Sequence, residues 1–196
     1  MTTLTFSTTP AFAKTQPDAL RELLNIQTQT IGFGESLKHL DQQALNAKAA
    51  EGKWSVLECL EHLNRYAAHY LPLLTISAST ALPRKKEIYK PGLLGKPFAI
   101  AMHPAKRDKT MSSPKNMNPI GSTLDTAVVD QFIADQTAFK TVLASLQGKS
   151  LRGSRVPISI VPIVRLHLGD MLHTLVWHNA RHSLQADEAL ATIAVL

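Results

Sequence analysis

Apolar residues recur at helical spacing in four separate stretches of the chain, and this spacing limits the possible folds more than any other feature. The stretches begin near Thr15, after Ser55, near Ser122 or Thr123, and at Leu168. In each stretch the apolar residues return every three or four positions, which places them on one face of a helix. Four helices that each bury one face, joined by one long crossing connection, predict an all-α fold, namely a four-helix bundle.

Capping residues place the start of two of these helices. Ser55 and Glu58 have the spacing of a capping box, in which the hydroxyl and the carboxylate each bind an otherwise free backbone N–H group. Thr15 and Asp18 provide a similar start for the first helix. The fourth helix is expected to cover about residues 168–187, while residues 41–53 and 149–165 are expected to be connections.

The long connection between the second and third helices, residues 84–119, is rich in proline and in basic residues. Residues 84–115 contain nine Lys or Arg and two Asp or Glu, a charge of +7, whereas the whole chain has +6. The basic charge therefore belongs to one segment and not to the fold as a whole. We expect a solvated cover over one end or side of the bundle, with anion or nucleic-acid binding as the alternative. Since only Tyr89 and Phe98 could stack on bases, nucleic acid is not the partner we expect.

The remaining composition suits an ordinary globular protein. A length of 196 residues and a hydrophobic fraction of 44% predict one domain, residues 1–196, with a buried core. The single cysteine, Cys59, excludes an intrachain disulfide and is expected in the core. No apolar run reaches the roughly 18 residues of a membrane span, and residues 1–13 lack the basic and apolar regions of a signal peptide. We therefore expect a cytoplasmic protein without a membrane partner.

Two histidines on the fourth helix, His178 and His182, are the main candidates for chemistry. They lie one turn apart on the stripe that contains Leu175, so both imidazoles can reach one ion from the buried face. The spacing alone leaves a second interpretation open, because hydrogen bonds can also satisfy a buried histidine pair. A third ligand has to come from another helix, where His62 is the candidate and His69 the weaker rival.

The other histidines are not expected to bind metal. His173 points to the opposite side of the fourth helix from His182, so it cannot join the same ion. Three more lack a partner at ligand spacing and are expected at the surface or in loops: His39, His103 and His167.

Residues 54–63 and, far downstream, residues 177–185 resemble the DinB-like family of metal-dependent proteins. The resemblance extends over nearly the whole chain, because the entry to the second helix, the basic insert and the start of the fourth helix also match. It implies a four-helix bundle in which His62, His178 and His182 bind one divalent ion, such as Zn, Ni, Fe or Mn. Their ring nitrogens should then converge to within about 4 Å of one another. The family also includes thiol S-transferases and a thiol-dependent isomerase. We expect a metal-dependent enzyme of the hydrolase or thiol S-transferase type.

The three-histidine site leaves room for a reaction. Three neutral ligands keep a bound ion positively charged, with open positions for water or a thiol substrate. Glu58, one turn from His62, is the candidate catalytic base. The other interpretation is that Glu58 only caps the second helix. Gln185 is expected to orient a histidine ligand. The alternative function is a non-enzymatic protein that uses the metal for structure, or binds an anion through residues 84–115.

The fourth helix also predicts self-association. Its face opposite the metal stripe holds Trp177 and Leu184, whereas a free helix face should be polar. Either the connections or a second copy of the chain must cover this face. We expect a homodimer with Trp177 at or near its interface.

Overall fold

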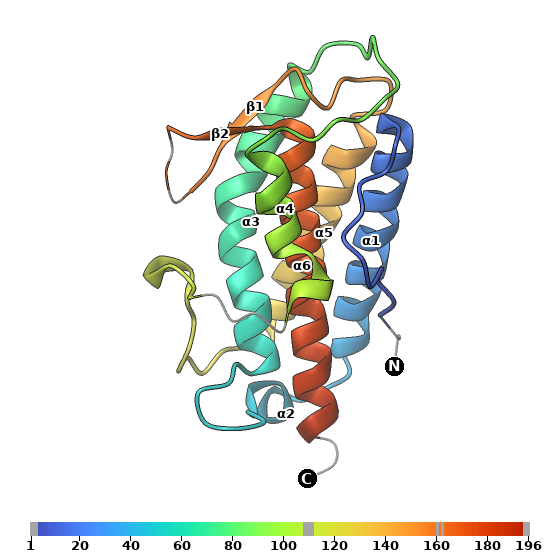
Figure 1. Cartoon of the computed structure of the whole chain (residues 1–196). Helices are drawn as coiled ribbons and strands as arrows, with labels where there is room; N and C mark the ends of the chain where they lie inside the picture. The colour runs from blue at the N-terminus through green and yellow to red at the C-terminus, as the bar shows by residue number, and fades with distance from the viewer. Residues whose placement is uncertain (1–3, 108–111, 160, 162, 194–196) are drawn as a thin grey trace.

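The computed structural model describes residues 4–107, 112–159, 161 and 163–193. Its long helices run side by side (Figure 1): α1 (Gln16–Leu37), α3 (Val56–Ser79), α5 (Ala127–Ala144) and α6 (Leu168–Ile193). Short helical segments lie between them: α2 (Gln42–Asn46), α4 (Gly95–Met102), η1 (Pro104–Lys106) and η2 (Lys115–Met117). The chain is mostly helical, as predicted. The exception among the described residues is an antiparallel pair of strands in the expected connection 149–165: β1 (Arg155–Pro157) and β2 (Arg165–His167).

The predicted caps begin two of the long helices. Ser55 Oγ accepts the backbone N–H of Glu58 at 3.1 Å, and Glu58 Oε2 accepts the backbone N–H of Ser55 at 2.8 Å, which completes the capping box of α3. Thr15 caps α1 through its side chain, as predicted. Helix α5 begins at Ala127, after Ser122 and Thr123, and Asp125 Oδ1, from the same group of possible capping residues, accepts the first backbone N–H group.

The interior contains two apolar clusters and a layer of polar side chains. One cluster includes Leu23, Phe139 and Val176, and the other includes Phe33, Phe132 and Ala186. On α1, α5 and α6 a buried amide lies in sequence between members of the two clusters: Gln27, Gln136 and Asn179. The side-chain amides of Gln27 and Asn179 both donate to Gln136 Oε1, at 2.5 and 2.7 Å. These bonds fix the register of the three helices, because a buried amide without partners is destabilising.

The face of α6 opposite the histidines is covered by the chain itself. Trp177 is 0% exposed, and the rings of Phe12 and His103 lie 5.1 and 4.6 Å from its ring. Helix α4 packs along α6 on this side (Figure 1). The prediction that Trp177 lies at a dimer interface is therefore wrong, because contacts within one chain already bury it.

The basic connection is more structured than predicted. Residues 84–119 include α4. His103, expected at the surface or in a loop, lies between α4 and η1 and is buried. The reason is that α4 has to cover Trp177, which draws the end of α4 inward. Five lysines among the described residues of this connection are exposed, as a solvated cover requires: Lys85, Lys86, Lys90, Lys96 and Lys115. The part of the basic segment at residues 108–111 lies outside the described residues.

Asp170, at the start of α6, anchors this connection. Its buried carboxylate accepts the Tyr89 hydroxyl at 2.8 Å and the backbone N–H of Gly92 at 3.0 Å. Gly95 packs so closely on the same carboxylate that any side chain at position 95 would collide with it. The entry into α4 therefore depends on a glycine at this position.

The substitution Gly95→Ala tests this packing. We expect it to lower the free energy of unfolding by about 1–3 kcal/mol, because the clash outweighs the better helix propensity of alanine. The matched control is Gly153→Ala, since an added Cβ at Gly153 meets no atom within 4 Å. Urea denaturation measures both. Equal unfolding free energies for the two variants would contradict the proposed close contact.

His173 makes stability depend on pH. It is fully buried, its Nδ1 donates to the Gly169 carbonyl at 2.7 Å, and burial lowers its pKa to about 4. In the unfolded chain a histidine has a pKa of about 6.5. At pH values between about 4 and 6.5, the unfolded chain binds a proton at this histidine and the folded protein does not. The contribution of His173 to the free energy of unfolding is therefore complete above about pH 6.5 and decreases as the pH falls toward 4.

We expect this loss to reach about 3 kcal/mol for His173 alone. Chelator-treated wild type and His173→Gln should therefore differ in the pH slope of their unfolding free energy, with the shallower slope in the variant. Identical slopes in urea denaturation between pH 7 and 4.5 would refute the assignment to His173.

Candidate metal centre

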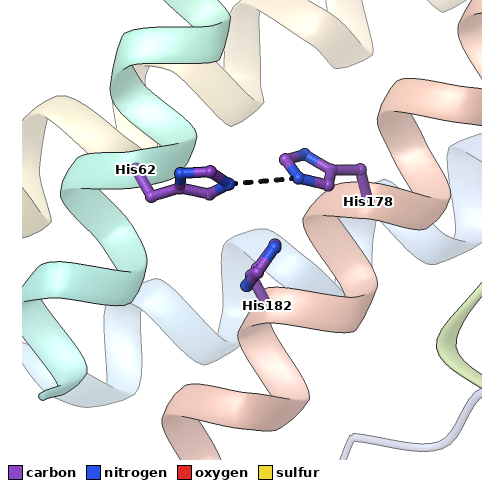
Figure 2. A group of neighbouring side chains, drawn as sticks. All are labelled: His62, His178 and His182. Atoms are coloured by element: carbon purple, nitrogen blue, oxygen red, sulfur yellow. Dashed lines mark hydrogen bonds between the residues drawn. The ribbon is translucent and has the colours of Figure 1, made fainter. Parts of the chain in front are cut away.

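Histidines from two helices point into the same space between α3 and α6 (Figure 2). His62 Nε2 lies 3.2 Å from His178 Nε2, and His182 completes a group in which one nitrogen per ring lies within 4.8 Å of the others. The structure thus brings together the three histidines expected from the sequence. Their spread exceeds the expected 4 Å, so a small ring rotation is needed to place every nitrogen about 2.0–2.1 Å from one ion.

Aromatic rings hold His62 and His182 in place. The Trp54 ring lies 4.8 Å from the His62 ring and 5.6 Å from the His182 ring, on which it stacks. Tyr66 packs against both His62 and His178, at 4.9 and 4.8 Å between ring centroids. These contacts bury His62 although its helix position lies beside the main apolar stripe. The two aromatic residues that flank it in sequence are the signal that could have indicated this burial.

Hydrogen bonds determine which nitrogens face the centre. His62 Nδ1 lies 2.7 Å from the Met117 carbonyl oxygen, which can only accept, so Nδ1 carries the proton and Nε2 keeps its lone pair. His182 Nδ1 likewise donates to Gln185 Oε1 at 2.9 Å, and this confirms the predicted contact of Gln185 with a candidate ligand. His178 Nδ1 is buried without a hydrogen-bond partner among the described residues. Two lone pairs are therefore directed at the centre by contacts outside it.

Burial keeps the three rings neutral. Desolvation lowers the pKa of His62 to about 4 and that of His182 to about 3, and it lowers the pKa of His178 well below its usual value. Repulsion adds to the shifts: a protonated His178 would be repelled by a protonated His182 or His62, and the cationic Arg65 disfavours protonation of His62. Neutral imidazole is the form that binds metal. Of the three residues, His182 is the one that is partly exposed.

Both carboxylate oxygens of Glu58 accept hydrogen bonds that stabilise the fold. Oε2 belongs to the capping box, while Oε1 accepts Lys48 Nζ at 2.8 Å and the Gly121 backbone N–H at 2.6 Å. These contacts favour the interpretation that Glu58 serves the fold, and its role as catalytic base stays a prediction. Cys59 beside it is fully buried, where desolvation raises the pKa of its thiol, as expected for a core residue.

The remaining histidines lie outside this group. His69, the weaker rival ligand, is exposed against the edge of Tyr70. His173 uses its Nδ1 on the backbone and does not join the group, as predicted. His39 is exposed and His167 lies on β2. The contact of Met117 with His62 was missed, because a backbone carbonyl leaves no signal in the sequence.

Comparison with known proteins agrees with this geometry. The family model described as the DinB superfamily matches residues 33–186, which include all three histidines and most of the chain. No curated protein and no solved structure matches the chain. Because the family match covers far more than half of the sequence, the chain belongs to the DinB superfamily.

Proposed function

We propose that this protein is a metal-dependent enzyme of the hydrolase or thiol S-transferase type. Its divalent ion would be held by His62, His178 and His182. The observation that carries this proposal is the convergence of three neutral imidazoles within 4.8 Å, two of which have their Nδ1 protons engaged elsewhere. Membership of the DinB superfamily supports it.

The donor set fits a borderline divalent metal. It consists of imidazole nitrogens, and within the described part of the chain no carboxylate or thiolate joins the group. Imidazole ligands suit ions such as Zn, Ni and Fe, and Mn is a further candidate. Structural zinc sites are usually closed by four protein ligands, whereas three ligands leave positions open for substrate. The open positions favour an enzyme over a bundle in which the metal is only structural.

Different residues of the chain would bind, orient and shield such a metal site. A bound ion would supply Lewis-acid activation of a substrate oxygen or sulfur. The Met117 carbonyl and Gln185 hold His62 and His182 in the tautomer that a metal ligand needs. Trp54 and Tyr66 pack on the ligand rings and exclude water from their faces. Access for a substrate remains on the half-buried side of His182.

The remaining expectations are also proposals. We propose that residues 1–196 form one DinB-like four-helix bundle domain built from α1, α3, α5 and α6, with residues 84–119 as its long connection. Within the described residues, no helix is both long and apolar enough to cross a membrane. A cytoplasmic location and a homodimer stay predictions, and Trp177 is not available for the dimer interface.

Metal analysis of protein purified without chelator or an affinity metal column tests the proposed site. We expect about one divalent ion per chain, and loss of that ion in His62→Ala and His178→Ala because two ligands bind weakly. The matched control is His69→Ala, an exposed histidine on the same helix as His62, which should keep the ion. A thiol-conjugation assay on the loaded protein then addresses the reaction. A wild type that takes up none of Zn, Ni, Fe or Mn would refute the proposal.

The alternative function, anion binding by residues 84–115, is supported by the exposure of Lys85, Lys86, Lys90 and Lys96. We nevertheless expect no measurable binding of DNA or RNA at low salt, because the segment offers few rings for stacking. Fluorescence anisotropy with labelled oligonucleotides measures this. Binding that weakens steeply with salt, and that Lys85→Glu with Lys86→Glu abolishes, would favour the alternative.

A further inference from the structure

We propose that Arg65 and residues 112–121 position His62 for metal binding. Arg65 holds this segment against α3, and the Met117 carbonyl within it selects the His62 tautomer that presents Nε2 to the ion. This inference rests on the proposed metal site and makes Arg65 a positioning residue of that site.

The contact with Met117 decides between two states of His62. With the proton on Nδ1, the ring donates to the Met117 carbonyl at 2.7 Å and keeps a lone pair on Nε2. With the proton on Nε2, the ring would instead donate to His178 Nε2, which is 3.2 Å away. That second hydrogen bond would block the ligand atom of His62, and it would leave the lone pair of Nδ1 facing the Met117 carbonyl oxygen, which cannot donate. The position of the Met117 carbonyl therefore controls whether His62 is available as a ligand.

Arg65 binds the backbone on both sides of Met117. Its Nη1 donates to the carbonyl oxygens of Asn118 at 3.3 Å and of Asn116 at 3.5 Å. Its Nε donates to Glu61 Oε1 at 2.8 Å, which orients the guanidinium along α3. Because Arg65 lies nearly one turn after His62, both residues are on the same face of α3. This face therefore carries the candidate ligand and the arginine that binds the segment around Met117.

A second anchor lies further along the segment. Glu58 Oε1 accepts the Gly121 backbone N–H at 2.6 Å, and Lys48 Nζ neutralises the same oxygen. Within residues 112–121 the only helical stretch is the short η2. A stretch with so little regular structure depends on such side-chain contacts for its position. The carboxylate of Glu58 thus also supports the site through the backbone of the connection.

The charge of Arg65 and its positioning contacts have opposite effects on metal affinity. A cation at Arg65 repels a metal ion at His62, so loss of the charge by itself would tighten metal binding. Loss of the positioning contact would weaken it, since outer contacts to ligand histidines typically contribute 10–100-fold in affinity. The two roles therefore predict opposite changes for one substitution.

The experiment measures the zinc dissociation constant of the full chain by competition with a chromophoric chelator. We expect Arg65→Met to raise the dissociation constant about 10-fold and Arg65→Lys to recover part of the affinity. The control is Arg107→Met, which removes an exposed arginine whose ion pair is with Glu188. It should leave the constant unchanged. An unchanged or lower constant for Arg65→Met would overturn the inference.

A second measurement does not depend on metal. Nitrogen-15 NMR of the chelator-treated protein should show His62 protonated on Nδ1 in the wild type and a mixture of tautomers in Arg65→Met. A wild type with the proton on Nε2, or a variant with the wild-type tautomer, would overturn the inference. If the wild type binds no zinc, the proposed function fails, and the NMR result still decides the role of Arg65.

Discussion

Helix α6 is buried around nearly its whole circumference, and the other elements are arranged to cover it. His178 and Leu175 face α3, while Trp177 and Ala180 on another side are equally buried. Because buried residues lie on most sides of α6 between Leu168 and Ser183, this part of the helix has to lie in the interior. The covering of its last free side by α4 explains why a basic, proline-rich connection folds back on the protein. Its apolar residue Ala99 packs inward, while the lysines remain in solvent.

The burial of α6 also sets the chemistry of its histidines. Removal from water disfavours the protonated rings, so the imidazoles stay neutral at pH 7. Neutral rings still need hydrogen-bond partners, and the partners of His62 and His182 occupy Nδ1 only. The inward nitrogens have few partners apart from each other. This arrangement is unfavourable for a purely structural core, and it is the arrangement that an ion would stabilise.

Covering contacts are the part of the structure that helical periodicity could not predict. The spacing of residues on α6 shows that Trp177 and Ala180 share a face, but it does not show what packs on that face. The same limit applies to His103, which follows the apolar residues 98–102 and whose ring contacts that of Trp177. In both cases the missing information is a pairing of α6 with a short helix in a segment whose prolines indicate a loop.

The sequence by itself determined the features that depend on neighbouring residues. The capping box of Ser55 and Glu58 and the common face of His178 and His182 follow from residues three or four positions apart, so local helix geometry is enough. Helix geometry alone could not show that His62 meets His178 across 116 positions, which the sequence indicated only through the resemblance to the DinB-like family. Only the tertiary structure decided that the Met117 carbonyl holds the His62 ring across 55 positions. Such contacts depend on how whole helices and connections pack, and no local spacing records that packing.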